Sequence, residues 1–528
     1  MTLAEYIADQ LYKSGVRYIF GIPGGASVPY LKAFRSAGIE FILTSGEAAA
    51  AIMADVSARL TGIPGVCHAT MGPGAVNLAS GLGGALLDRS PVIAFTNEPD
   101  ESMINRTSQM NIDQQVLFRP VTKASLRAGT GSAEEILSRA FGLCREEYPG
   151  PVHISLPAGI ADTGADGLHD ISWENSTSSS SDDTGRIISL LRESRRPLIA
   201  AGLTAFRHGA GKKLMNFLEQ YKVPVIVTPM AKGLIPEEHP SFAGVLFHSL
   251  SDYLKEIYSR TDLVIGLGYD QVEYNYESWI PDVPLVHFDT RETDLPEKGI
   301  VERFTGTPDE WFSIMHNLNP GALIFEKTVV GGIRNEMAAV FNGFKNHFGP
   351  VTAQGILMEE LPSDTIVTVD VGSHLHLAGQ YWKIRGKGKL LMTNGWSGMG
   401  FGIPAAIASQ IHNPESRVVC ITGDGGFLMM AGELMVARRL NLPVIIIIFS
   451  DGELNLIRLR QTRLGLAPDG TLLYSGDLFD SDIFLGIKVI HAGSSDEMTR
   501  AVREALKLNE PVIINAAIDP EDYGWLVE

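Results

Sequence analysis

The stretch "VVCITGDGGFLM", residues 418–429, combines an apolar run with a carboxylate between glycines. Four apolar residues and a threonine are typical of a buried strand, and Asp424 follows directly after Gly423. In an open parallel sheet, ligands bind beyond the carboxyl ends of the strands. Glycines let the backbone approach a ligand closely, and a helix starting near Phe427 would offer free N–H groups to an anion. A carboxylate here indicates a cation bridging it to an anion such as a diphosphate, or, more simply, a helix-capping aspartate.

A second acidic residue occupies the equivalent place one unit later. The apolar run "LPVIIIIF", residues 442–449, predicts another core strand, and Asp451 follows it. Asp451 lies 27 residues after Asp424, which is the length of one strand–helix–strand unit. Because neighbouring parallel strands end at the same sheet edge, we expect the two carboxylates to lie close together.

This pattern resembles the metal–diphosphate motif of thiamine diphosphate-dependent enzymes. The resemblance implies that Asp424, Asp451 and the backbone carbonyl of Glu453 hold magnesium or another divalent cation. It also implies contacts between the diphosphate and three glycines, which are Gly423, Gly425 and Gly426.

Two further segments of the C-terminal third are similar to this family. "GWSGMGFGIPAAIAS", residues 395–409, resembles the segment that props the cofactor into a bent shape. Met399 matches the prop, and the carbonyl of Ser397 would accept the amino group of the pyrimidine. "DVGSH", residues 370–374, resembles a turn that contacts the diphosphate, through Gly372, Ser373 and His374.

A glutamate near the N-terminus is the candidate catalytic residue. "FILTSGEAAAAIMADVSARLTG", residues 41–62, predicts a strand, a turn and an alanine-rich helix with Glu47 at its start. Favourable interaction with the helix dipole is the simpler explanation. The family pattern is matched by Glu47, Ala58-Arg59 and Thr61-Gly62. The resemblance implies that Glu47 bonds the ring nitrogen of the aminopyrimidine and supports proton exchange there.

Other N-terminal segments are also close to the family pattern. "GIPGGASVPYL", residues 21–31, and "ATMGPGAVNLASGLGGALLDRSPVIAFT", residues 69–96, contain the candidate cofactor-binding residues Gly25 and Gly72. "RTSQMNIDQQVLFRPVTK" resembles the active-site glutamine segment, with Gln109 as the candidate. His68 matches a position where an aryl-2-oxo-acid decarboxylase of the family carries a catalytic histidine, or it is simply a packed strand residue.

Strands and helices alternate along the chain, which predicts an α/β protein. Residues 163–185 are Ser- and Asp-rich, as in a linker, and strand signals lapse around 318–350. With the resemblance, we expect three doubly wound parallel-sheet domains of the thiamine diphosphate enzyme type. They are a pyrimidine-binding domain at 1–165, a linker at 166–185, a Rossmann-like middle domain at 186–325, and a diphosphate- and metal-binding domain at 326–528.

Within the family, the sequence is most similar to the acetolactate synthase-like group. That similarity implies decarboxylation of a 2-oxo acid, with pyruvate favoured, and joining of the remaining fragment to a second carbonyl. No His-His pair occurs, which disfavours a pyruvate decarboxylase. "GLGYDQVEYNYESW", residues 266–279, resembles FAD-free members and lacks the arginine-bearing stretch of FAD-containing ones, so the resemblance implies no bound FAD. No G-x-G-x-x-G or P-loop pattern occurs, which argues against a nucleotide site in the middle domain.

Alternatives remain open because several positions depart from the family pattern. Gly46 precedes Glu47 and Ser108 precedes Gln109, where histidines are usual, and the loop 450–455 lacks the usual Tyr-Gly. The alternatives are a carboligase of specialised metabolism with another substrate pair, a non-ligating decarboxylase, and a cofactor-binding protein without turnover. In the decarboxylase, His68 or His374 would donate the proton.

Composition restricts the partners. The net charge of −18 without a basic stripe argues against nucleic acid and anionic membranes. The longest apolar run, "VIIIIF", is too short to cross a bilayer, and residues 1–16 lack the features of a secretory signal. Three cysteines without metal-ligand spacing, Cys67, Cys144 and Cys420, indicate buried thiols in a cytoplasmic protein. The resemblance further implies a homodimer or homotetramer with the active site at the subunit interface.

Overall fold

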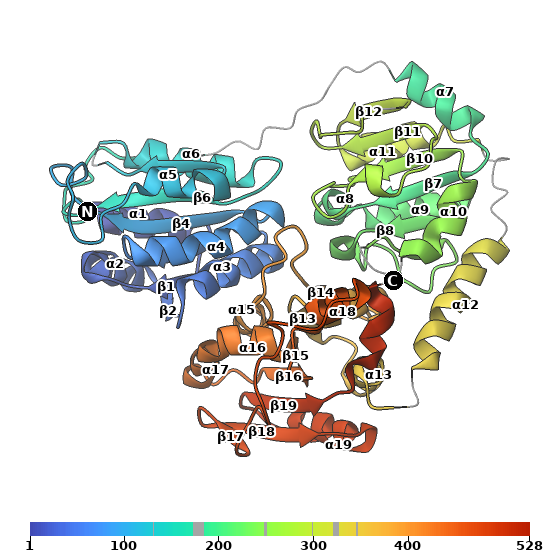
Figure 1. Ribbon diagram of the computed structural model, residues 1–528. Coiled ribbons are helices and arrows are strands. Elements are labelled where there is room, and N and C mark those ends of the chain that lie inside the picture. The colour runs from blue at the N-terminus through green and yellow to red at the C-terminus, as the bar shows by residue number, and fades with distance from the viewer. Residues whose placement is uncertain are drawn as a thin grey trace.

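The computed structural model of the chain contains three β-sheets, each flanked by helices (Figure 1). The structure describes residues 1–129, 131–172, 184–247, 251–297, 299–319, 327–344 and 347–527. All strand pairs are parallel except one at the edge of the third sheet. The α/β fold with three mostly parallel sheets is therefore confirmed.

The first sheet carries the N-terminal candidate residues. In order across the sheet its strands are β2 (Glu40–Leu43), β1 (Tyr18–Ile22), β3 (Gly65–Ala69), β4 (Val92–Glu98), β6 (Val152–Pro157) and β5 (Ala124–Arg127). One face is covered by α1 (Leu3–Lys13), α2 (Val28–Ala37) and α6 (Ala133–Arg145). The other face is covered by α3 (Glu47–Thr61), α4 (Pro73–Leu87) and α5 (Gln114–Phe118).

The middle sheet reverses its strand order between β7 and β10, which creates a crevice typical of a nucleotide site. Its strands, in order, are β12 (Val301–Thr305), β11 (Leu285–Asp289), β10 (Leu263–Leu267), β7 (Pro197–Ala201), β8 (Val225–Val227) and β9 (Phe242–Val245). Its helices are α7 (Gly185–Glu193), α8 (Leu203–Arg207), α9 (Gly211–Tyr221), α10 (Lys255–Arg260) and α11 (Pro308–Met315), and α12 (Lys327–Gly343) packs beside β9.

The third sheet carries the predicted metal and diphosphate residues. Its strands, in order, are β14 (Lys389–Leu391), β13 (Ile366–Val369), β15 (Val418–Gly423), β16 (Ile445–Ser450), β19 (Val512–Ala517), β18 (Ile487–Ala492) and β17 (Ile483–Phe484). Its helices are α13 (Pro350–Glu360), α14 (Ser373–Tyr381), α15 (Gly402–His412), α16 (Asp424–Met430), α17 (Leu434–Arg439), α18 (Asn455–Arg463) and α19 (Ser495–Ala505). The strands expected on either side of Asp424, β15 and β16, are both present.

The lobes built on the first and third sheets share one apolar core, in which α15 lies against α3 (Figure 1). The alanines of α3 also allow α4 to pack closely on it. A Cβ added to Gly81 of α4 would lie 2.5 Å from the backbone oxygen of Ala48 and 2.6 Å from the Cβ of Ala51. The helix that begins with Glu47 is thus fixed between its own sheet and the third lobe.

Some sequence predictions fall partly outside the described residues. The described residues do not include 173–183, which belong to the predicted linker, or the predicted boundary at 325/326. The domain limits therefore stay predictions. The three cysteines are buried and free, as expected. Among the described helices, none has the length and apolar character needed to cross a membrane.

Candidate active site

Asp424 and Asp451 meet at one edge of the third sheet. Their strands β15 and β16 are parallel neighbours, with Gly423 opposite Phe449. The carboxylate of Asp424 accepts hydrogen bonds from the backbone N–H groups of Asp451 (3.2 Å) and Gly452 (2.7 Å). Burial and the charge of Asp424 raise the pKa of Asp451 to about 7. Two acids held this closely in a buried place are stabilised by a cation between them.

The oxygen atoms at this edge suit a hard divalent cation. The carboxylate of Glu453 forms an ion pair with Arg458 on α18 at 2.8 Å, so its backbone carbonyl is the candidate ligand, as the resemblance implied. The hydroxyl of Tyr474 donates to Asp424 at 3.0 Å. Sequence reasoning missed Tyr474, because a loop 50 residues downstream gives no local signal of this contact.

The helix after Asp424 begins earlier than predicted. Asp424 itself is the first residue of α16, whereas the sequence suggested a start near Phe427. The carboxylate of Asp424 accepts the N–H of Gly425 at 2.8 Å. An acidic residue in the first turn interacts favourably with the helix dipole, and this interaction offsets the poor helix propensity of the glycines.

Buried polar atoms without partners line the adjacent end of β13. The hydroxyl of Ser373 and Nε2 of His374 are buried and have no hydrogen-bond partner among the described residues. Burial lowers the pKa of His374 to about 3, so its ring is neutral. A Cβ on Gly423 would lie 3.1 Å from this ring, and Gly372 adopts a φ of 156°. An anionic ligand accepting from these groups would satisfy the unpaired atoms.

Met399 lies over the start of α16. A Cβ on Gly425 would lie 3.1 Å from Cε of Met399, and one on Gly426 would lie 2.8 Å from Oδ2 of Asp370. Asp370 was not singled out from the sequence, although it also follows an apolar strand. Its buried carboxylate accepts N–H hydrogen bonds from Gly400 (2.8 Å), and so it fixes the loop that carries Met399.

Ser397 lies on the same loop in an unusual backbone conformation. Its φ is +52°, and its hydroxyl donates to the carbonyl of Asn394 at 2.8 Å. Ser397 is exposed and Met399 is partly buried. The sequence-predicted residues of the C-terminal third therefore gather at the ends of β13, β15 and β16 and on this loop.

Glu47 is the first residue of α3 and is 7% exposed. Its Oε2 accepts a hydrogen bond from the amide of Asn77 at 3.1 Å. A Cβ on Gly74 would lie 3.0 Å from Oε1, so the glycine leaves room for the carboxylate. The glutamate is thus oriented by α4, and sequence reasoning had not assigned that role to Asn77.

The other N-terminal candidates surround the start of α4. A Cβ on Gly72, whose φ is +66°, would lie 2.5 Å from the carbonyl of Met110, which brings the exposed Gln109 beside this helix end. Gly25 lies in a short 3-10 turn with no atom within 4 Å of an added Cβ. The preceding Gly24 packs on Thr70, which also borders the helix start.

Glu433 supports Glu47 from the third lobe. Its buried carboxylate accepts the N–H of Ser45 at 3.0 and 3.1 Å, two residues before Glu47. Burial raises the pKa of Glu433 to about 7. The contact joins residues 388 positions apart, so no sequence pattern could have revealed it.

His68 has a different environment from the other candidates. It lies on β3, it is 1% exposed, and its Nε2 is 2.7 Å from the hydroxyl of Ser27. That hydroxyl donates to Asn97 at 2.6 Å, so we infer that Nε2 of His68 carries the proton. Burial lowers the pKa of His68 to about 4. The structure places His68 among residues that support the loop after β1.

Comparison with known proteins identifies the family. The chain matches the model "Thiamine pyrophosphate enzyme, N-terminal TPP binding domain" over residues 1–117. The corresponding central domain matches over 184–302 and the C-terminal TPP binding domain over 370–516. The chain belongs to the thiamine pyrophosphate enzyme family. Thiamine pyrophosphate is thiamine diphosphate, so the two groups of candidate residues fall within the two TPP binding domains of the family.

Relatives of this thiamine pyrophosphate enzyme carry names of one kind. A probable acetolactate synthase large subunit of Methanocaldococcus jannaschii is 30% identical, covering 98% of this chain and 92% of that protein. The acetolactate synthase isozyme 2 large subunit of Escherichia coli K12 is 27% identical over 99% of this chain and 97% of its own. An acetolactate synthase of Bacillus subtilis is 26% identical, covering 98% and 93%.

Proposed function

We propose that this protein decarboxylates a 2-oxo acid, with pyruvate the favoured donor, and joins the remaining fragment to a second carbonyl compound. It is an acetolactate synthase-like, thiamine diphosphate-dependent enzyme. The observation that carries the proposal is the meeting of Asp424 and Asp451 beside Gly425, beneath Met399. This edge offers oxygen ligands for a cation next to unpaired donors for an anion.

The residues fit the cofactor in two parts. Magnesium or another divalent cation would be held by Asp424, Asp451 and the carbonyl of Glu453. The diphosphate and the rest of the cofactor would be held by Gly423, Gly425, Gly426, Gly372, Ser373, His374, Ser397 and Met399. When bound, the cofactor supplies the electron sink for loss of the carboxylate.

Glu47 would hold and exchange the proton of the pyrimidine ring nitrogen. Its low exposure and its hydrogen bond from Asn77 keep the carboxylate in one orientation. Contacts across the domain boundary, from Glu433 to Ser45, fix the start of its helix. Gly25, Gly72 and Gln109 would border the substrate and the pyrimidine on the same side.

The active site would be completed by a second copy of the chain. Exposed apolar side chains flank both groups of site residues, with Leu428 and Met429 following Asp424 (48% and 58% exposed) and Val76 on the helix of Asn77 (49% exposed). A partner covering these residues supports a homodimer or homotetramer, in which Glu47 of one copy faces Asp424 of the other.

A complementation experiment tests this arrangement. Glu47→Gln and Asp424→Asn would each be inactive alone. A mixed dimer of the two variants contains one intact site if the residues come from different copies, so co-expression would restore activity. If each site is built within one chain, the mixed dimer remains inactive.

The decarboxylase alternative is weakened by the two histidines that would serve as proton donors. Burial lowers the pKa of both His68 and His374, to about 4 and about 3. Both rings are therefore neutral at pH 7, and a neutral imidazole is a poor acid. The altered loop at 450–455 keeps a different donor and acceptor pair as the second candidate.

We propose that FAD is not bound. At the crevice between β7 and β10, the N–H of Thr204 donates to the carbonyl of Gly268 at 3.0 Å. A Cβ on Gly202 would lie 2.7 Å from Cα of Tyr269, so the two loops are in contact. An absorption spectrum of the purified protein and acid extraction of flavin test whether FAD is bound.

A cytoplasmic location is proposed from the free cysteines, and the net charge supports the absence of nucleic-acid partners.

Proton NMR tests the proposed reaction. The purified protein is incubated with thiamine diphosphate, magnesium and pyruvate, with Glu47→Gln as the matched control. Acetolactate, or acetoin from its decay, in the wild type alone would support carboligation with pyruvate as donor and acceptor. Acetaldehyde alone would support the decarboxylase, and no consumption of pyruvate would require a different 2-oxo acid.

A further inference from the structure

We call the loop that carries Ser397 and Met399 the cofactor loop. The segment before it is held by the first lobe of the same chain. Asp88, at the end of α4, has a fully buried side chain. Its carboxylate accepts the backbone N–H of Asn394 at 3.2 Å and of Gly395 at 2.9 Å. These two amides lead directly into Ser397 and Met399.

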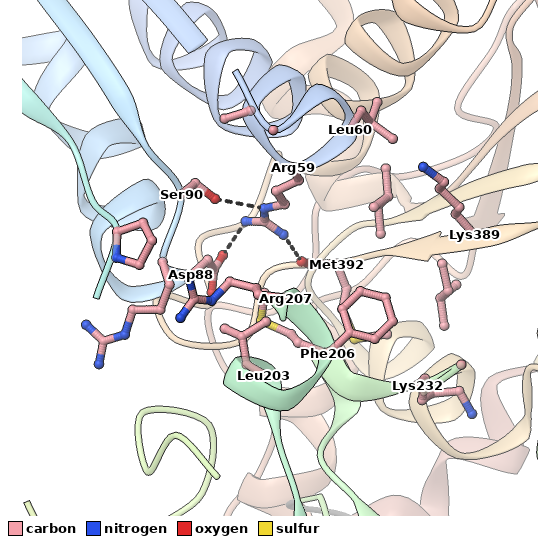
Figure 2. Close-up of a pocket in the computed structure, with 18 of the residues that line it drawn as sticks. Arg59, Leu60, Asp88, Ser90, Leu203, Phe206, Arg207, Lys232, Lys389 and Met392 are labelled. Atoms are coloured by element: carbon pink, nitrogen blue, oxygen red, sulfur yellow. Dashed lines mark hydrogen bonds and ion pairs between the residues drawn. The ribbon is translucent and has the colours of Figure 1, made fainter. Parts of the chain in front are cut away.

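Arg59, near the end of α3, completes the contact (Figure 2). Its guanidinium donates to the carbonyl of Met392 at 2.7 Å and to Asp88 at 2.9 Å. Asp55 and Ser90 hold the same guanidinium at 2.6 and 3.1 Å. Arg59, Asp88 and Met392 line a cavity of about 810 Å³ between the three lobes, and Figure 2 shows the bonds of Arg59 to Ser90, Asp88 and Met392. We call the pair the Arg59–Asp88 clamp.

The loop beyond the clamp needs such support. Ser397 has a positive φ, which L side chains adopt only when their surroundings impose it. The ring of Trp396 packs on α4, where a Cβ on Gly83 would lie 2.8 Å from it. Residues 392–397 are thus shaped by α3 and α4 of the first lobe rather than by the third sheet alone.

We propose that Arg59 and Asp88 are positioning residues that hold segment 392–399 in its cofactor-binding shape. The inference rests on the proposed function, since that assigns Ser397 and Met399 to the cofactor. Arg59 and Glu47 lie at opposite ends of α3, so one helix serves both the proton-exchanging carboxylate and the cofactor loop. Loss of the clamp weakens cofactor binding, because the loop then samples other conformations.

A second ion pair provides a matched control. Arg89 donates to Asp270 at 2.6 and 3.1 Å, and both side chains are largely buried. This pair joins the first lobe to the middle lobe. The further hydrogen bonds of its side chains in the described part of the chain are to Leu86 and Val272, not to segment 392–399. Arg89→Met therefore removes a comparable guanidinium between lobes and leaves the clamp intact.

Hydrogen–deuterium exchange of the cofactor-free protein tests the clamp directly. We expect Asp88→Asn and Arg59→Met to accelerate exchange of peptides covering 392–399 by about tenfold or more, and Arg89→Met to leave them unchanged. Titration with thiamine diphosphate and magnesium should show Kd raised about tenfold in the two clamp variants. At saturating cofactor their kcat should return to within a few-fold of wild type.

Unchanged exchange of 392–399 in both clamp variants would overturn the proposal. Faster exchange with an unchanged Kd would overturn it as well, because the loop shape would then not matter for binding. The exchange measurement needs no cofactor, so it is independent of the proposed function. Failure of the wild-type protein itself to bind thiamine diphosphate would count against the proposed function instead.

Discussion

The carboxylate of Asp424 accepts a hydrogen bond from the backbone N–H of Asp451 at 3.2 Å. This contact places two acidic side chains at the ends of neighbouring buried strands, and the pKa of Asp451 is raised to about 7 by burial and by Asp424. Without a cation, the deprotonated pair destabilises the fold. The metal-free protein should therefore show the repulsion as a dependence of its stability on pH.

Asp451→Asn should stabilise the metal-free protein at pH 8. The folded pKa of Asp451 lies above its unfolded value of 3.8, so the stability it contributes is present at low pH and is lost as the pH rises through about 7. Asparagine has no such loss, and we expect a gain on the order of 1–3 kcal/mol at pH 8. Urea unfolding at several pH values measures it. A gain that does not grow with pH, or that persists in saturating magnesium, would contradict this account.

Glu47→Gln should abolish turnover without preventing cofactor binding. Glutamine keeps the shape of the side chain but cannot exchange the proton, which we expect to reduce kcat by about 10²–10⁴-fold. Calorimetric titration with thiamine diphosphate should give a Kd within a few-fold of wild type. Glu40→Gln, at an exposed position on β2, is the control. A Glu47→Gln variant with more than a tenth of wild-type kcat would rule out the assigned role.

The middle lobe should lose stability at alkaline pH, because Glu273 is buried there. Its carboxylate accepts the N–H of Met230 at 2.9 Å, and burial raises its pKa to about 8. Its contribution to stability is present below the unfolded pKa and is lost as the pH rises through about 8. Glu273→Gln should flatten the decline of Tm between pH 6 and 9, and the exposed Glu277→Gln should not. Parallel curves for all three proteins would show that Glu273 does not titrate in this range.

His68→Gln should alter stability rather than proton transfer. The ring is already neutral at pH 7, and its hydrogen bond to Ser27 ties β3 to the loop after β1. We expect a loss of about 0.5–1.5 kcal/mol, similar to that of Ser27→Ala. The profile of kcat against pH should keep its shape. A shift of that profile in His68→Gln alone would support the catalytic role suggested by the resemblance.

Local sequence patterns made the pair of aspartates in the site predictable. Asp424 and Asp451 each follow an apolar run, and strand neighbours bring such ends together, so their meeting could be inferred. The contacts of Glu433 with Ser45 and of Asp88 with Asn394 join positions 388 and 306 apart. They depend on how the lobes pack, and a single polar residue in a helix or turn does not announce a distant partner.

The start of α16 shows how packing overrides propensity. Two glycines after Asp424 suggested a loop, because each costs about 1 kcal/mol in a helix. In the structure a Cβ at Gly425 would lie 3.1 Å from Cε of Met399, and one at Gly426 would lie 2.8 Å from Oδ2 of Asp370, so a larger residue would crowd these neighbours. The helix forms despite its composition, and this depends on residues from other strands.

Calorimetric titration of thiamine diphosphate into the metal-free protein tests the central claim, that Asp424 binds the cofactor through a divalent cation. The titration is run with magnesium, with a chelator, and with Asp424→Asn. We predict one cofactor per chain for the wild type in magnesium, and loss of binding in the chelator and in the variant. Binding that is equally tight with the chelator, or with Asp424→Asn in magnesium, would contradict the account.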